Sequence, residues 1–197
     1  MKQRFYLTFV FAFFFVLLGR SQNFSLSQNI DQGWQAKAFA YLQNEQYGFK
    51  ASNEKSFHAV NAKNKLGVHV TPVGYSIGRD EITANFRVKS VAGEKVNGDQ
   101  LRHVENTATT LRYHYSAHTI EYKNSEEGLR QNFILNEKGK SASVVLQIIS
   151  SLQPDLANDR LVLKDKNGKE RFYYDGLKVW DANGKLLDAS MQLKGDE

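Results

Sequence analysis

The sequence of 197 residues contains no cysteine and only two prolines, Pro72 and Pro154. Without cysteine, neither a disulfide framework nor a thiolate metal site can form, so packing must supply the stability of the fold. No proline-rich or low-complexity linker divides the chain, whose length suits a single domain. A dense block of lysine or arginine is also missing. Nucleic-acid binding neutralises several phosphates from one face, so we do not expect nucleic acid as a partner.

The first 22 residues have the pattern of a secretory signal peptide. Lys2 and Arg4 precede an apolar run over residues 5–18, and a short polar segment, residues 19–22, follows it. The run is shorter than the roughly 20 apolar residues that span a bilayer, so we expect cleavage rather than a retained anchor. The sequence therefore predicts an exported chain, placed in the periplasm or on the outer surface of a bacterial cell, with no membrane span after cleavage.

The expected domain division is a signal peptide at 1–22 and a single β-rich domain at 23–197. Cleavage would remove Lys2, Arg4 and Arg20 and no acidic residue, so the formal net charge would fall from +5 to +2. The high isoelectric point of about 9.3 thus belongs partly to the leader.

Hydrophobic periodicity predicts one helix followed by strands. Between Asp31 and Glu45, apolar residues recur at helical spacing, so we expect an amphipathic helix with Asp31 as its cap. These apolar residues are Trp34, Ala38, Tyr41 and Leu42. Beyond residue 46 the period changes to two, as in 82–89, where every second residue is apolar. Such alternation predicts half-buried strands.

Five further segments predict strands or turns. Leu111, Tyr113 and Tyr115 alternate with polar residues, as do Ile120 and Tyr122. Residues 144–149 are apolar on both faces, which favours a central strand covered on each side. Two similar Asp-x-Asn-Gly-Lys turns, at 165–169 and 181–185, predict hairpins, since Asn-Gly supplies positive φ angles. Residues 161–193 should therefore form a meander of three or four strands.

The expected fold is all-β, an antiparallel β-sandwich-like domain with one N-terminal amphipathic helix packed over an edge or an open end.

Three groups of segments carry a shared pattern in this order: Trp34 with 45–47, 57–61 and 66–74; then 121–135; and finally 174–185. Together they resemble an N-terminal β-rich module of large secreted bacterial surface proteins. In that family the module usually precedes FG-GAP-like or β-propeller repeats, and sometimes a type IX secretion sorting tail. The resemblance implies no catalytic residues, and since family members continue through at least one further strand, it implies that the domain lacks its last strand or strands. Asn132 stands where a small residue is commoner.

Two histidines, His114 and His118, are the weak candidates for a metal site, because four-residue spacing can place two imidazoles on one face. Zinc would need a third ligand, and an exposed polar strand face explains the pair better, so we expect neither a metal nor another cofactor. The Asp-x-Asn-Gly turns lack the later glutamate of a calcium loop, since twelve residues from Asp165 or Asp181 end at Gly176 or Gln192.

Catalytic patterns are missing. Glu126 and Glu127 are adjacent, and neighbours in a strand point to opposite faces, so they cannot form a glycosidase pair. Serine-hydrolase, phosphate-loop and zincin motifs do not occur. Among the many aromatic residues, Tyr173 is the weak candidate for ligand binding, since it should face opposite to Phe172 and Tyr174.

The function expected from these observations is that of a non-catalytic extracytoplasmic accessory or interaction module. Its partners would be other domains of the same or a neighbouring envelope protein. The alternative is a carbohydrate-binding β-sandwich module that uses exposed aromatics, with a glycan as partner. A secreted hydrolase with dispersed carboxylates is a second alternative.

Overall fold

The computed structural model describes residues 32–136 and 142–195. The proposed signal peptide and the helix cap expected at Asp31 lie outside these residues. Within the described ranges, no helix is long and apolar enough to cross a membrane.

One helix and sixteen strands, many of them short, make up the described chain. The helix α1 spans Gln32–Tyr47 and a 3-10 turn spans Gly98–Gln100. The strands are β1 (Lys50–Ala51), β2 (Phe57–Asn61), β3 (Leu66–Thr71), β4 (Gly74–Arg79), β5 (Ile82–Val91), β6 (Glu94–Lys95), β7 (His103–Thr107), β8 (Thr110–His114), β9 (His118–Ser125), β10 (Gly128–Leu135), β11 (Val144–Ile149), β12 (Gln153–Ala157), β13 (Arg160–Lys164), β14 (Glu170–Tyr174), β15 (Val179–Trp180) and β16 (Leu186–Leu187).

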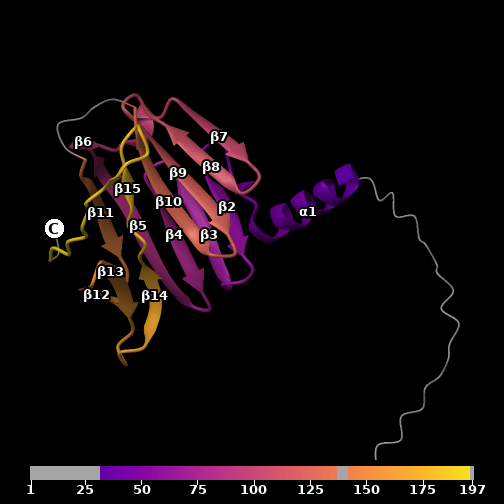
Figure 1. Cartoon of the computed structure of the whole chain (residues 1–197). Helices are drawn as coiled ribbons and strands as arrows, with labels where there is room; N and C mark the ends of the chain where they lie inside the picture. Colours follow the sequence, from indigo (N-terminus) through magenta and orange to yellow (C-terminus); the bar gives the residue numbers. More distant parts are fainter. Residues whose placement is uncertain (1–31, 137–141, 196–197) are drawn as a thin grey trace, which may run out of the picture.

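The strands form a sandwich of antiparallel sheets (Figure 1). The large sheet has the order β1-β2-β3-β4-β5-β11, with β6 paired to β5. A second sheet, β10-β9-β8-β7, packs over one part of it, and a third, β12-β13-β14, packs over another. Ring contacts join the layers: Tyr75 of β4 meets Tyr122 of β9 at 5.6 Å, and Phe86 of β5 meets Tyr174 of β14 at 6.1 Å. The expected all-β, sandwich-like fold is confirmed.

Alternation along the strands explains which face each buries. In β5, Ala84, Phe86 and Val88 are buried while the residues between them are exposed, as the sequence predicts. Leu111 and Tyr113 of β8, with Ile120 and Tyr122 of β9, have no exposed surface. Every second residue of these strands therefore contributes to one core between the sheets.

The core is rich in tyrosine, and three of the tyrosine hydroxyl groups form hydrogen bonds. The Tyr113 hydroxyl lies 2.9 Å from the Lys55 carbonyl, and Tyr115 donates to the Pro72 carbonyl. Tyr122 accepts from Gln131 Nε2 at 3.0 Å. Burial raises the pKa of all three phenols, so they stay protonated at neutral pH.

Two buried asparagines link the sheets. Asn61, at the end of β2, donates to Asn124 Oδ1 of β9 at 2.7 Å. Asn124 Nδ2 lies 2.9 Å from two carbonyl oxygens, those of Val60 in β2 and of Tyr47 at the end of α1. One side chain thus connects both sheets with the base of the helix.

The expectation that the helix packs over the sandwich is wrong. Figure 1 shows α1 extending away from the sheets, and Trp34, Tyr41 and Leu42 are more than half exposed. At 100° per residue, Trp34, Ala38 and Tyr41 share one side, but Phe39 and Ala40 lie on others. The apolar residues therefore form no single stripe that could cover the core, and α1 is not clearly amphipathic.

The expectation of a central strand at 144–149 is also wrong. This segment, β11, pairs with β5 alone and forms an edge of the large sheet within the described chain. Val145 and Ile149 are about half exposed. An apolar segment buries both faces only when a further layer covers the outer one, and the sequence does not reveal that layer.

Both predicted hairpin turns are confirmed. Gly168 and Gly184 have φ angles of +77° and +79°. The four strands of 161–193 do not form one meander, however, because β13 and β14 belong to a sheet with β12, whereas β15 and β16 form a separate hairpin.

Candidate functional site

The outer face of the sheet β10-β9-β8-β7 carries three rows of side chains, which we call the polar face. Each row follows from the strand register, because residues paired across antiparallel strands point to the same side. The rows are His103, His114, Thr119 and Ile134; Glu105, Arg112, Glu121 and Asn132; and Thr107, Thr110, Lys123 and Arg130.

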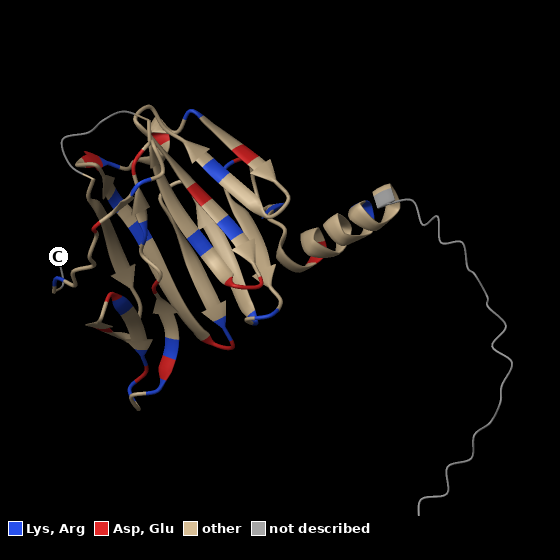
Figure 2. Ribbon diagram, in the orientation of Figure 1, with Lys and Arg blue, Asp and Glu red and all other residues tan. Residues whose placement is uncertain are grey.

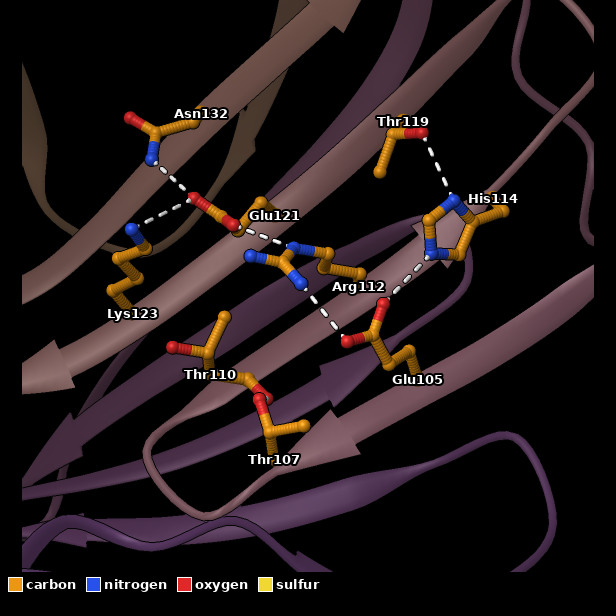
Figure 3. Close-up of polar contacts among 9 residues, drawn as sticks. All are labelled: Glu105, Thr107, Thr110, Arg112, His114, Thr119, Glu121, Lys123 and Asn132. Carbon is orange, nitrogen blue, oxygen red and sulfur yellow. Dashed lines mark hydrogen bonds and ion pairs between the residues drawn. The ribbon is translucent and has the colours of Figure 1, made fainter.

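The middle row forms a continuous chain of hydrogen bonds across four strands (Figure 3). Arg112 donates from NH1 to Glu105 at 2.9 Å and from Nε to Glu121 at 2.7 Å. Asn132 Nδ2 donates to the other oxygen of Glu121 at 2.8 Å, and Lys123 lies 3.5 Å from that oxygen. Neighbouring side chains thus cover Glu121, which is only 4% exposed although it lies on an outer face.

These contacts set the pKa values of both carboxyl groups. Burial acts to raise the pKa of Glu121, but hydrogen bonds from Asn132 and Arg112, together with the charges of Lys123 and Arg112, outweigh it and lower the pKa. The hydrogen bond from Arg112 lowers the pKa of Glu105. Both groups therefore stay ionised at neutral pH. A general acid needs the opposite shift, so the row does not provide one.

The two candidate metal-binding histidines lie on opposite faces of their sheet. His114 is on the polar face, where its ring stacks on His103 at 4.1 Å and its nitrogens lie 3.1 Å from Thr119 Oγ1 and 3.4 Å from Glu105. His118 is on the inner face, 3% exposed and stacked on Tyr115 at 4.8 Å. In the described residues, no three histidine or carboxylate side chains gather as metal ligands.

The buried ring of His118 has no hydrogen-bond partner at either nitrogen within the described part of the chain. Burial lowers the pKa of His118, against the opposing charge of Glu94. A neutral imidazole packed on an aromatic ring is a core residue, and the structure does not bring another ligand to it.

Tyr173 points outward, opposite to Phe172, as its place in the strand predicts. Its ring is 59% exposed, and the Arg160 guanidinium lies 4.7 Å from the ring centre. Asp175 lies 3.9 Å from Arg160. One ring face is thus partly covered by a side chain of the neighbouring strand, which leaves less of it for stacking on a ligand.

The acidic turn residues act within their turns. The Asp165 carboxylate accepts from the backbone amides of Asn167 and Lys169, and Asp181 accepts from those of Asn183 and Lys185. Arg171 also pairs with Asp165 at 2.6 Å, and its hydrogen bond lowers the pKa of that carboxyl. Hairpin geometry accounts for these oxygens, as sequence reasoning proposed.

The middle row was missed by sequence reasoning. Alternating polar residues in 103–107, 110–114, 118–125 and 128–135 indicate solvent-facing strand positions. They do not give the strand register, which decides that Glu105, Arg112 and Glu121 lie side by side. The short loops between these strands indicate antiparallel hairpins, and assuming such pairing would have given the register.

Part of the segment 121–135, whose pattern resembles the middle of the secreted-protein module, is explained by packing. Asn124 joins the sheets, Gln131 bonds to Tyr122, and Asn132 bonds to Glu121. These three side chains therefore hold the fold together.

Comparison of the chain with protein families, curated proteins and solved structures finds no match to any of them.

The ion pairs of the middle row predict a pH-dependent contribution to stability. Because the Glu121 pKa is lowered in the folded state, its contribution is present above the ordinary value of 4.5 and is lost as pH falls through the folded pKa. Glu121→Gln should cost about 1–3 kcal/mol of unfolding free energy at pH 7.

Urea unfolding at a series of pH values measures this effect. The difference between Glu121→Gln and the unsubstituted protein should shrink below pH 4.5, whereas Glu127→Gln, at an exposed site, should change stability by less than about 0.5 kcal/mol. A pH-independent loss at Glu121 would contradict the ionic origin.

Proposed function

We propose that the chain is a non-catalytic interaction module that docks against another domain or protein through its C-terminal third. The observation that carries this proposal is the set of exposed apolar side chains in that region. Burying one such side chain stabilises a complex by about 1.5–3 kcal/mol, and surface patches of this kind mark interaction sites. The set comprises Val144, Val145 and Ile149 of β11, with Leu177, Trp180, Leu186, Leu187 and Leu193.

The state of the polar groups supports the same proposal. The carboxylates of the polar face are ionised and paired, the core tyrosines bond to backbone or side chains, and His118 is buried. A hollow of about 350 Å³ beside α1 is lined mainly by neutral side chains, among them Gln43, Gln46 and Thr109. Acid and base side chains do not converge there, so the hollow offers little for catalysis.

The leader-like N-terminus and the resemblance of three segment groups to a secreted-protein module support an extracytoplasmic partner. We propose that the partner is another domain of the same or a neighbouring envelope protein. Packing against such a domain would cover the apolar residues of β15 and β16, which the described chain leaves in contact with solvent.

The second candidate function is carbohydrate binding, which the outward position of Tyr173 favours. Stacking of a sugar on this ring would compete with the Arg160 guanidinium that already lies over it. We therefore expect that any glycan binding seen on an array persists in the Tyr173→Ala variant. Strong binding lost in that variant, while Phe39→Ala on α1 retains it, would favour the carbohydrate-binding function instead.

Site-specific photocrosslinking tests the docking proposal. A benzophenone side chain placed at Trp180 or Val145 should give a discrete adduct on irradiation of producing cells. Replacement of both Leu186 and Leu187 by serine should weaken the adduct at Trp180, because it removes apolar contact area.

The matched control carries the same probe at Lys166, an exposed position in the β13–β14 turn. This position should give no adduct. Absence of adducts at both Trp180 and Val145, in a chain shown to be folded by circular dichroism, would contradict the docking proposal.

A further inference from the structure

The long edge strands of the described sheets differ in how they are protected against further pairing. An edge strand leaves backbone N–H and C=O groups open, and charges, proline or shortness normally block their use. Among the described edge strands of five or more residues, β11 is the one without a charge, a proline or a glycine in its sequence. The others carry Glu105 in β7, Arg130 in β10, Pro154 and Asp155 in β12, and Glu170 and Arg171 in β14.

The strand β11 also presents apolar side chains beside its open edge. Val145 is 48% exposed and Ile149 49% exposed. A register irregularity lies between Val145 and Leu146, after which residues 146–149 pair regularly with β5. Four residues of regular, uncharged edge are thus available to pair with another extended strand.

Basic side chains lie next to this edge on the outer face of the large sheet. Arg87 and Lys89 are exposed residues of β5, the strand that pairs with β11, and Lys95 follows on β6. Figure 2 shows basic residues, drawn blue, along this part of the large sheet. Arg87, Lys89 and Lys95 border a hollow of about 360 Å³. No carboxylate of the described chain forms an ion pair with any of the three.

The sheet register places Arg87 on the strand next to this edge, on the same face as Gln147. Gln147 of β11 lies opposite Arg87, and on its other side Arg87 is opposite Gly74, which has no side chain to pair with it. A strand added to β11 would lie about 9–10 Å from β5, two strand spacings away. The combined lengths of an arginine and a glutamate side chain cover that distance.

We propose that β11 accepts an extended acidic segment of the partner as an additional strand. The backbone of that segment would pair with the free edge of residues 146–149. Its alternate carboxylates would lie on the outer face and meet Arg87 and Lys89, and the apolar side chains between them would point to the inner face, beside Leu146 and Ile148. This inference rests on the proposed docking function and names the partner's chemistry.

Charge decides between this occupant and a second copy of the chain. Two β11 strands pairing about a two-fold axis through Gln147 would bring Arg87 and Lys89 of both copies to one surface, and neither β5 nor β11 carries a carboxylate to offset them. Like charges brought together weaken association. An acidic strand would pair with the same backbone edge, and its negative charges would attract Arg87 and Lys89.

Synthetic peptides test the proposal. The probe is a fluorescent, end-blocked seven-residue peptide in which valine and glutamate alternate, and binding to the purified protein is followed by fluorescence anisotropy. We expect saturable binding, weakened about tenfold when lysine replaces glutamate. N-methylation of alternate backbone amides, which keeps the charge but blocks strand pairing, should also weaken binding about tenfold.

Charge reversal of the protein gives the complementary test. Arg87→Glu with Lys89→Glu should weaken the glutamate peptide about tenfold and strengthen the lysine peptide, since both residues are exposed and the fold does not need them. The control, Lys166→Glu with Lys178→Glu, makes the same change in net charge at exposed positions elsewhere and should leave binding unchanged. Hydrogen exchange should slow at residues 146–149 in the complex.

Other outcomes would overturn the inference. Equal binding of the N-methylated peptide, or tighter binding of polygalacturonate than of the peptide, would assign the basic residues to an anion site without strand addition. Concentration-dependent dimerisation of the protein that slows exchange in β11 would assign the edge to a second copy. Crosslinks at Val145 without peptide binding would overturn this inference alone. Absence of peptide binding together with absence of crosslinks at both Val145 and Trp180 would overturn the docking function as well.

Discussion

The hydrogen bonds of Asn61 and Asn124 are the contacts on which the arrangement of the two main sheets depends. Asn124 has 1% of its surface exposed, and its amide reaches β2 and the last turn of α1 at once. Inside a core such a pair is costly to break, because a buried polar atom that loses its partner cannot form a hydrogen bond with water instead. The pair therefore fixes where β9 lies over β2, and with it the position of β8 and β10, the two strands paired to β9.

That constraint determines which surfaces are left for function. With β9 in place, Glu121 lies between Arg112 and Asn132, so the acidic and basic groups of the polar face neutralise one another. The groups without such partners lie elsewhere: Arg87, Lys89 and Lys95 beside β11, and the apolar residues of β15 and β16. The surfaces that the proposed docking function uses therefore lie away from the polar face.

Local sequence patterns predicted the secondary-structure elements well, but they predicted poorly which elements pair or pack with one another. Alternation over 82–89 and the Asn-Gly turns at 167–168 and 183–184 depend on residues close in sequence, and the structure confirms both. The positions of β11 at an edge and of α1 outside the sandwich depend on which layers cover them, which no local pattern encodes. The row Glu105, Arg112 and Glu121 was missed for the same reason, since strand register is a property of pairs. The candidates His114, His118 and Tyr173 were found, but the structure separates the two histidines and places Arg160 over the tyrosine.

A double-mutant cycle on Asn61 and Asn124 tests the central constraint most directly. Unfolding free energies would be measured in urea for Asn61→Ala, Asn124→Ala and the double variant. Each single change should cost about 1–3 kcal/mol, and the double change should cost clearly less than their sum, with a coupling of at least about 1 kcal/mol. Additive losses, or single losses below about 0.5 kcal/mol, would show that the sheets are held in place by apolar packing alone.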